Sequence, residues 1–297
     1  MLPWMPRVSV ILATYNRSRL VVEAIHSVLA QTYRVYEIIV ADDGSSDDTL
    51  ERLAALDGHI RAVALKHSGM PEVSRNRAIA IARGDLIAFL DDDDLWQPEY
   101  LKRQVEVLDR DKNLGFVYCD ICFLHSDGSV SAPRMLSRHK EAGAMLDHLL
   151  GGCFIYPSTL MVRRHLFDQV GPMDEDISSQ GDFAFLLRLA SVSRAGCVPE
   201  PLALIRRHSS NLSSFREILD CQNTIRIFVG FQKTGALNLR QRLLLREYLS
   251  RYHTHLGLLK LGAGELHDAR QAFIQALQLN PFRRRAWIAL LQYCSRK

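Results

Sequence analysis

The stretch GDLIAFLDDDDLW, residues 84–96, decides the fold, because four consecutive aspartates follow directly on a short apolar run. The apolar residues Leu86–Leu90 do not alternate with polar residues, which is typical of a strand buried on both faces of a parallel sheet. The carboxylates of Asp91–Asp94 therefore come where a buried strand ends. Ligands of open α/β sheets bind beyond the carboxyl ends of the strands, so this stretch predicts a fold class and the place of a binding site.

Four adjacent carboxylates repel one another, since two unit charges about 4 Å apart interact by about 4 kcal/mol at an effective dielectric of about 20. A divalent cation would turn this repulsion into attraction. Oxygen ligands favour a hard ion such as Mg²⁺ or Mn²⁺, which completes its shell with water and substrate phosphates. We therefore expect a metal and phosphate site at residues 91–94, with a solvated acidic turn as the alternative.

Upstream of this stretch, apolar strands end in polar turn residues and helical patterns follow them, and further strands and helices are predicted downstream of it. Strands are predicted within residues 7–16, 36–42, 60–67, 85–90 and 115–125. Helices are predicted within residues 19–33, 45–56, 72–84, 98–111, 139–152 and 181–192. The alternation of strand and helix predicts an α/β fold in which helices cover both faces of a parallel sheet.

The last part of the chain has a different character. From about residue 216 the pattern is helical, and residues 216–297 hold 14 Lys and Arg against 5 Asp and Glu, a balance of +9, which leaves −5 for residues 1–215. We therefore predict two domains, 1–215 and 216–297. GELHDARQAFIQALQLNP, residues 264–281, has the spacing of the second half of a tetratricopeptide-like helix pair, with a simple helical cap as the alternative.

Composition and cysteine content exclude several classes of protein. No apolar run approaches the ~18 residues of a membrane span, and the N-terminus lacks the apolar core of a signal peptide, so we expect a cytoplasmic protein. The six cysteines suggest no disulfide framework. Cys119 and Cys122 have C-x-x-C spacing, but they lie in a predicted strand with no second pair to complete a zinc site.

Four ordered motifs together resemble the family 2 glycosyltransferases. They are VSVILATYNR (8–17), YEIIVADDGSSDDT (36–49), SRNRAIAIARGDLIAFLDDDDLWQPEYL (74–101) and GPMDEDISSQGDFAFLLRLA (171–190). The resemblance covers about residues 6–213. It implies a GT-A-type (Rossmann-like) α/β fold with a mixed, mainly parallel sheet flanked by helices, to which the C-terminal helices add an all-helical appendage.

The resemblance also implies a function. It is that of an inverting, metal-dependent transferase that moves a sugar from a nucleotide-diphospho-sugar, expected to be a UDP-sugar, to a saccharide or lipid-linked saccharide acceptor. Such a reaction belongs to the synthesis of cell-surface polysaccharides or glycans. By the same resemblance, the residues expected to contact the nucleotide or its diphosphate are Thr14, Tyr15, Arg17, Asp42, Arg75, Asn76, Asp91, Asp92 and Arg206. Asp43, next to Asp42, is expected to tie down the turn. A hydrogen-bonded turn alone is the alternative that would explain both residues.

The resemblance places Mn²⁺ or Mg²⁺ on Asp93, with Asp91 and His208 as further candidate ligands. Asp182 takes the position of the catalytic base, which removes the proton of the acceptor hydroxyl, with helix capping as its alternative role. Gly181 stands where the family usually has Glu. A catalytically silent relative that binds a nucleotide sugar or a partner protein is therefore the alternative function.

The basic tail suggests a further partner. Arg283–Arg285 stand beside Phe282, Trp287 and Ile288, a mixture suited to peripheral contact with an anionic membrane at the inner face of the cell, or to a protein partner. The sequence favours solvated helix ends over either kind of contact. No recognition motif accompanies the charge, so we expect no nucleic-acid partner.

Overall fold

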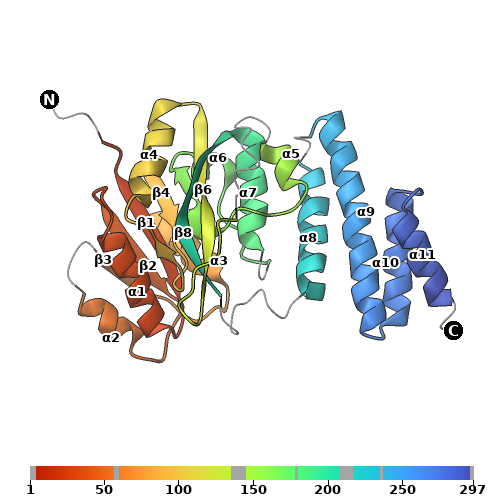
Figure 1. Cartoon of the computed structure of the whole chain (residues 1–297), viewed down its shortest axis with the longest axis horizontal. Coiled ribbons are helices and arrows are strands. Elements are labelled where there is room, and N and C mark those ends of the chain that lie inside the picture. The colour runs from red at the N-terminus through yellow and green to blue at the C-terminus, as the bar shows by residue number, and fades with distance from the viewer. Residues whose placement is uncertain are drawn as a thin grey trace. The chain divides into compact units, whose positions relative to one another are not determined.

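The computed structural model describes residues 5–56, 60–134, 145–177, 180–207, 217–234 and 237–294 (Figure 1). The chain forms two compact units. The first comprises Met1–Met145, Phe154–Glu175 and Arg188–His208, and the second comprises Leu146–Cys153, Asp176–Leu187 and Ser209–Lys297. The second unit thus takes two short segments from within the residues predicted as the first domain, and the predicted division after residue 215 stays a prediction.

The first unit is built on one eight-stranded sheet, with strand order β3-β2-β1-β4-β7-β6-β8-β5. Its strands are β1 (Val8–Thr14), β2 (Glu37–Asp42), β3 (Ile60–Ala64), β4 (Leu86–Phe89), β5 (Leu95–Trp96), β6 (Leu114–His125), β7 (Met161–Arg163) and β8 (Arg194–Arg207). The strands β1 to β4 pair in parallel, β7 is antiparallel to β4 and β6, and β8 is parallel to β6. The sheet is therefore mixed and mainly parallel, as predicted.

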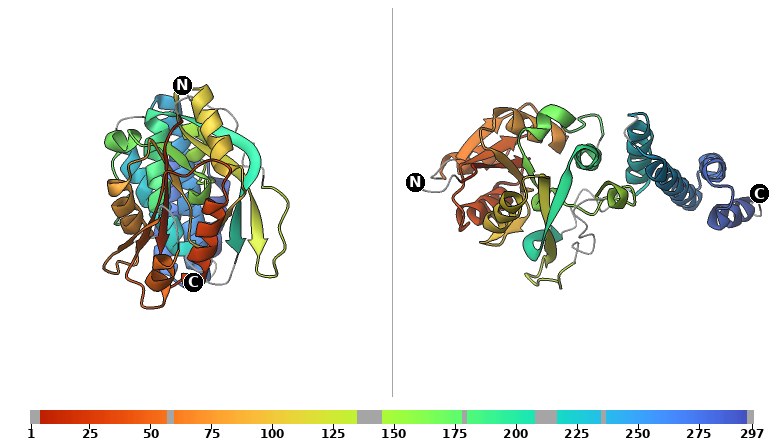
Figure 2. Two further views of the ribbon diagram at one scale, coloured as in Figure 1. Left: turned by 90° about the vertical axis from the view of Figure 1, so that its left-hand side faces the viewer. Right: turned by 90° about the horizontal axis from the view of Figure 1, so that it is seen from above.

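Helices flank this sheet, as the views in Figures 1 and 2 show. They are α1 (Ser18–Leu29), α2 (Thr49–Ala54), α3 (Pro71–Ile81), α4 (Tyr100–Arg110) and α6 (Leu166–Val170). In α1 the buried residues Val21, Ala24, Ile25 and Val28 recur at helical spacing, so a single apolar face packs on the rest of the unit. The helix α3 packs on β1 and β2, and α4 packs on β6 and β8. The predicted helices at 19–33, 45–56, 72–84 and 98–111 are confirmed.

The strand β8 was not predicted, and its prolines explain why. Pro199 and Pro201 lack the N–H that a ladder needs, so they argue against a strand in the sequence. In the structure Cys119 pairs with Val198 and the next residue, Asp120, pairs with Pro201, so two residues of β8 are left out of the ladder. This bulge lets the strand continue to Arg207.

The second unit is helical. Its helices are α5 (Met145–Leu149), the first part of α7 (Gly181–Val192), α8 (Glu217–Gln232), α9 (Leu239–Gly262), α10 (Leu266–Leu279) and α11 (Arg284–Cys294). Phe228 makes edge-to-face contacts with Phe183 and Tyr252, each with ring centroids 5.7 Å apart, which joins α7, α8 and α9. Phe273 of α10 is fully buried and lies against Gly257 of α9. The predicted helix at 264–281 is confirmed by α10.

Among the described residues, no helix combines the length and the apolar character that a membrane crossing requires.

Candidate functional site

The carboxyl ends of β1, β2 and β4 meet at one edge of the sheet. Thr14 pairs with Asp42 in the β1–β2 register, and Ile11 pairs with Phe89 in the β1–β4 register. The acidic loop, which we define as Asp91–Asp94, follows β4 at this edge. The parallel topology thus brings three of the quoted motifs together, as expected for ligand sites of this sheet type.

The acidic loop is anchored to β1 and α1. Thr14 Oγ1 donates a hydrogen bond to Asp92 Oδ2 over 2.7 Å, and both residues are buried. The guanidinium of Arg17 lies between two of the aspartates, with its Nη1 atom 2.8 Å from Asp92 Oδ1 and 2.8 Å from Asp93 Oδ2. A single cationic group of the protein therefore offsets part of the charge of two neighbouring carboxylates.

A second arginine holds the first aspartate of the loop. Arg75 Nη2 lies 2.5 Å from Asp91 Oδ1, and its Nη1 lies 3.7 Å from Glu72 Oε1 of the same helix. A divalent metal was expected to relieve the repulsion among the aspartates. The structure shows that Arg17 and Arg75 already relieve it in part, and their predicted contacts with a nucleotide stay predictions.

Asp94 is buried and fixes the acidic loop to two other segments of the chain. Its carboxylate accepts hydrogen bonds from Ser158 Oγ at 2.5 Å and from the backbone N–H of Arg206 at 2.9 Å. Burial, together with the nearby charges of Asp91 and Asp93, raises the pKa of Asp94 well above its usual value.

The same serine joins the loop to the following strand. Ser158 Oγ accepts a bond from the Asp91 N–H at 3.0 Å, and the Ser158 carbonyl accepts one from Trp96 Nε1 at 2.7 Å. Trp96 is buried and stacks on Tyr100 with ring centroids 3.9 Å apart. Trp96 therefore packs in the core beside the acidic loop.

Asp92 has an unusual electrostatic environment. Burial raises the pKa of its carboxyl to about 6, although the charge of Arg17 acts in the opposite direction. Asp93, next along the chain, keeps 13% of its side chain exposed and Asp91 keeps 31%. Solvent therefore reaches Asp91 and Asp93, whereas the buried Asp92 carboxylate holds the loop in place through its bonds to Thr14 and Arg17.

The turn after β2 is fixed by its own aspartates. Asp42 accepts hydrogen bonds from the N–H and hydroxyl of Ser45. Asp43 accepts bonds from the Ser68 N–H at 2.9 Å and the Gly69 N–H at 2.8 Å, which ties this turn to the loop after β3. The predicted anchoring role of Asp43 is confirmed. Asp42 makes the hydrogen-bonded turn that was its alternative role, and its contact with a nucleotide stays a prediction.

Gly44 explains why this turn can approach the next loop. It has φ of +80°, and a Cβ at this position would lie only 2.9 Å from the His67 backbone nitrogen. Glycine is the residue that adopts this conformation without steric cost, so the DDGS sequence suits the geometry of the turn.

An aromatic platform stands beside these turns. Tyr15 stacks on His67 with ring centroids 4.1 Å apart and an interplanar angle of 20°, and Tyr15 is 41% exposed. His67 Nδ1 lies 3.0 Å from Asp43 Oδ2, which fixes the imidazole in place. An exposed aromatic ring held in this way can stack on a nucleobase. His67 was not predicted as a site residue, because its only signal in the sequence is its position at the end of a predicted strand.

Asn76 of α3 binds the chain at residues 173–175 rather than the acidic loop. Its Nδ2 atom donates to the Met173 carbonyl and to Glu175 Oε1, each at 2.9 Å, and its Oδ1 atom accepts from the Met173 N–H at 2.9 Å. The amide therefore fixes the chain around residues 173–175. The predicted contact of Asn76 with a nucleotide is not seen in these bonds and stays a prediction.

Arg206, near the end of β8, reaches the acidic loop by its side chain as well. Its Nε atom donates to the Asp93 carbonyl at 2.8 Å, and its Nη2 atom lies 2.8 Å from Glu23 Oε2 of α1. Glu23 was not predicted as a site residue, since an acid on an amphipathic helix gives no signal in the sequence. His208 lies outside the described residues.

Asp182 begins α7 together with Gly181, within the second compact unit. Its Oδ1 atom accepts a hydrogen bond from the Phe183 N–H at 2.8 Å. Acids in the first turn of a helix are favoured by the helix dipole, so this position stabilises the ionised carboxylate. Its role as a base stays a prediction.

The acidic loop can be tested for fit to a metal ion. Among the described residues, no group of three or more His, Cys, Asp or Glu side chains is arranged to enclose a metal. The loop does present the partly exposed carboxylates of Asp91 and Asp93. Mg²⁺ and similar ions commonly use one or two carboxylates and complete their shell with water and substrate phosphates, so this donor set fits such an ion.

Sequence comparisons place the chain among known transferases. The profile described as "Glycosyl transferase family 2" matches residues 9–171. The putative teichuronic acid biosynthesis glycosyltransferase TuaG of Bacillus subtilis is 31% identical over 170 residues, which cover 56% of this chain and 66% of TuaG. The UDP-Glc:alpha-D-GlcNAc-diphosphoundecaprenol beta-1,3-glucosyltransferase WfgD of Escherichia coli is 32% identical over 165 residues, which cover 54% of this chain and 62% of WfgD. The matched part is thus just under two thirds of each relative.

Two solved structures share the fold. TarS 1-349 of S. aureus in complex with UDP-GlcNAc superposes with a TM-score of 0.76 at 18% identity, covering 97% of this chain and 89% of that one. The mannosyltransferase PcManGT from Pyrobaculum calidifontis, in complex with GDP-Man and Mn²⁺, superposes with a TM-score of 0.60 at 18% identity, covering 98% of this chain and 85% of that one.

Proposed function

Because the chain belongs to glycosyl transferase family 2, we propose that it transfers a sugar from a nucleotide-diphospho-sugar to an acceptor hydroxyl, with inversion at the anomeric carbon. It has the GT-A fold that the resemblance implied. The observation that carries the proposal is the anchored acidic loop, where Arg17 joins Asp92 and Asp93 at the carboxyl ends of the strands. Carboxylates for a metal and guanidinium groups for a diphosphate occur together at this edge.

We infer that the donor is a UDP-sugar. WfgD is named for UDP-Glc, and the TarS structure contains UDP-GlcNAc. In this chain Tyr15 offers an exposed ring for the base, and Thr14 and Asp42 stand at the ends of the neighbouring strands β1 and β2. Arg17 and Arg75 bring positive charge to the loop where a diphosphate would lie.

The same residues define the proposed chemistry. Asp93 and Asp91 would hold Mn²⁺ or Mg²⁺, with His208 as a further ligand. When bound, the ion supplies Lewis-acid stabilisation of the charge on the leaving diphosphate. Arg206 keeps the loop in shape through its bond to the Asp93 carbonyl. Asp182 accepts the proton of the acceptor hydroxyl while that oxygen bonds to the anomeric carbon and the bond to the diphosphate breaks. A single displacement of this kind inverts the anomeric centre.

The acceptor is proposed to be a saccharide or a lipid-linked saccharide of a cell-surface polymer. Support comes from the relatives, since TuaG is named for teichuronic acid biosynthesis and WfgD for a diphosphoundecaprenol-linked acceptor.

A nucleotide-sugar-binding protein without turnover is the second candidate, because Gly181 replaces the Glu that the family usually carries.

The proposal is tested by UDP release from UDP-GlcNAc and UDP-Glc, with Mn²⁺ and with EDTA. We expect metal-dependent release that falls at least about 100-fold in Asp93→Asn, which corresponds to an activation barrier higher by about 2.7 kcal/mol. Asp109→Asn is the matched control, since Asp109 is an exposed carboxylate that pairs with Lys112 on the surface. Undiminished release by Asp93→Asn would refute the site assignment. Metal-dependent binding of UDP without release from any donor would favour the second candidate.

A further inference from the structure

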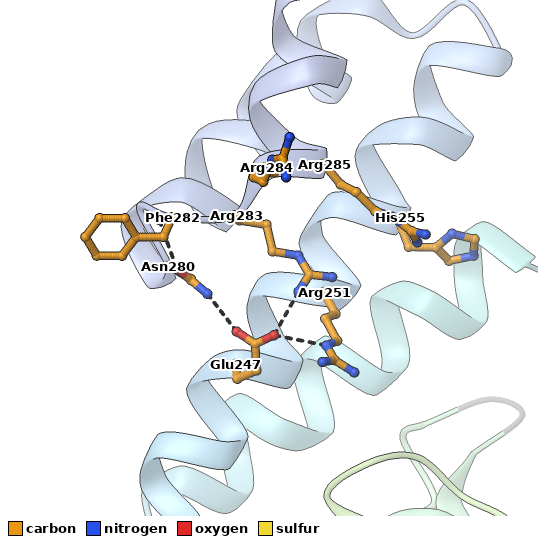
Figure 3. A pocket seen from close by; sticks show the side chains of 8 residues that line it. All are labelled: Glu247, Arg251, His255, Asn280, Phe282, Arg283, Arg284 and Arg285. Carbon is orange, nitrogen blue, oxygen red and sulfur yellow. Dashed lines mark hydrogen bonds and ion pairs between the residues drawn. The ribbon is translucent and has the colours of Figure 1, made fainter.

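The second compact unit contains an open pocket of about 760 Å³ that the proposed reaction does not use. It lies where α9, the end of α10 and the start of α11 meet (Figure 3). Its lining residues are Glu247, Arg251, His255, Asn280, Phe282, Arg283, Arg284 and Arg285. We call it the arginine pocket.

The charge of the arginine pocket is strongly positive. Four arginines line it against one carboxylate, so with a neutral histidine the formal balance is 4 − 1 = +3. Glu247 is fully engaged, since its carboxylate binds Arg283 Nη1 at 2.8 Å, Arg251 Nε at 3.0 Å and Asn280 Nδ2 at 2.7 Å (Figure 3). One carboxylate cannot offset four guanidinium groups, so the pocket suits an anion.

Two local features strengthen this conclusion. Arg283 Nε is buried and has no hydrogen-bond partner within the described part of the chain, and a buried donor without a partner destabilises the fold. The helix α11 begins at Arg284 and carries no acid in its first turn. Arginines at the positive end of a helix dipole are unfavourable, and an anion bound there would offset both effects.

An apolar stripe adjoins the arginine pocket. Ala286 and Ala289 form the buried face of α11, whereas Trp287, Ile288 and Leu291 lie on the opposite face and are 49%, 51% and 67% exposed. Phe282, at the mouth of the pocket, is 89% exposed, and its ring points away from the Glu247 network (Figure 3). We define these four exposed side chains as the apolar stripe. Exposed aromatic and aliphatic groups beside arginines are the pattern of interfacial membrane helices.

We propose that the start of α11 docks on an anionic phospholipid surface, with a lipid phosphate in the arginine pocket and the apolar stripe in the headgroup region. Charge complementarity selects this occupant, because residues 216–297 carry a balance of +9 and the pocket concentrates that charge next to apolar side chains. A phosphate without a membrane would use the arginines but leave the stripe in water. A second copy of this chain would bring the same net charge of +9 to the interface, so the two copies would repel each other. The proposal does not depend on the transferase reaction.

The test is sedimentation of the full chain with vesicles of neutral phospholipid and with vesicles that contain about 30% anionic phospholipid. Binding is expected only to the anionic vesicles, and it should weaken between about 0.1 M and about 0.5 M salt. The variant Arg284→Glu/Arg285→Glu should lose at least about tenfold in partitioning. Lys233→Glu/Arg270→Glu makes the same change in net charge at exposed positions outside the pocket and should stay within about threefold of the wild type.

A second variant tests the stripe without changing charge. Trp287→Ser/Leu291→Ser should also weaken vesicle binding at least about tenfold, with an unchanged far-UV circular dichroism spectrum and melting temperature. The proposal is overturned if the wild type ignores anionic vesicles at low salt, or if both charge variants lose binding equally. It is also overturned if inorganic phosphate binds while vesicles do not, or if the stripe variant instead dissociates a dimer in analytical ultracentrifugation.

Discussion

At the scale of single residues, the acidic loop shows how arginines make an aspartate cluster compatible with a folded protein. The guanidinium of Arg17 bridges Asp92 and Asp93, and Asp92 is buried. Removing one partner of a buried ion pair is costly because the other charge is left without compensation. The loop geometry thus depends on a residue from a different motif.

This dependence predicts a stability effect. Arg17→Gln should lower the free energy of unfolding by about 1–2 kcal/mol, less than the full cost of breaking a buried pair because the arginine side chain is 28% exposed. Urea denaturation measures the change. Arg19→Gln is the matched control on the exposed side of the same helix and should change stability by less than about 0.5 kcal/mol. Equal stability of the two variants would show that Arg17 does not hold the loop.

A second prediction at this scale separates binding from chemistry. Asp182→Asn should retain the stabilisation of the protein by UDP and Mn²⁺, while transfer to the acceptor falls by about 10² to 10⁴. The reason is that an amide cannot accept the proton of the acceptor hydroxyl. Transfer rates and thermal shifts of the same preparation measure the two effects. Full transfer by this variant would assign the base to another carboxylate, with Asp174, Glu175 and Asp176 as the next to substitute.

The sequence allowed only some of these residues to be predicted. Asp91–Asp94 follow directly on an apolar run, so the pattern placed them at the end of a strand, whereas Thr14 and Asp42 were expected at the site only through the family resemblance. Three further residues contact the site or the residues that hold it: His67, Glu23 and Ser158. The sequence around each of them contains no pattern that indicates this role. Such contacts depend on tertiary structure and could not be predicted from spacing.

At the scale of elements, small residues decide how closely the C-terminal helices pack. Gly257 of α9 lies against the ring of Phe273 in α10, and a Cβ at this position would lie 2.6 Å from Phe273 Cδ1. Gly230 of α8 has no neighbour within 4 Å of the corresponding point. The two glycines therefore differ in packing although both are inside helices.

Alanine substitutions at these two positions should have opposite effects. Gly257→Ala should lower stability by about 1–2 kcal/mol, because overpacking outweighs the gain in helix propensity. Gly230→Ala should raise stability by about 0.5–1 kcal/mol through helix propensity alone. Chemical denaturation of both variants beside the wild type gives the comparison. Stabilisation by Gly257→Ala would mean that α9 and α10 are not packed as closely as described.

Helices and strands were predicted where the local sequence has a clear apolar run or a helical spacing of apolar residues. The strands β1 to β4, which are apolar runs, and the helices α1 to α4, which have helical spacing, were predicted. The two-residue β5 and three-residue β7 are too short for a periodic signal. The strand β8 was not predicted because its prolines argue against a strand. The bulge that accommodates them depends on pairing with β6, which the local sequence does not reveal.

At the scale of the whole molecule, ligand binding should be visible as stability. A ligand present at about 100 times its Kd stabilises the folded state by about 2.7 kcal/mol, which corresponds to a rise of about 5–10 °C in melting temperature for a domain of this size. We expect UDP and Mn²⁺ together to give such a rise, and either alone to give much less. Differential scanning fluorimetry measures it. A shift that survives EDTA and Asp93→Asn would contradict a metal shared between the acidic loop and the diphosphate.

The opposite charges of the two parts of the chain were predictable at this scale from composition alone. The grouping of Leu146–Cys153 and Asp176–Leu187 with the C-terminal helices was not, since membership of a compact unit depends on contacts between distant segments. The anchored acidic loop and the arginine pocket lie in different units.

The bracing of the acidic loop has a consequence for how the protein is made. The backbone amide that binds Asp94 belongs to Arg206, 112 residues further along the chain, and the Ser158 hydroxyl comes 64 residues after the aspartate. A nascent chain still on the ribosome therefore completes the β1 to β4 strands well before the loop receives these two bonds. Competence for nucleotide binding should arise late in translation, after Arg206 has emerged from the exit tunnel.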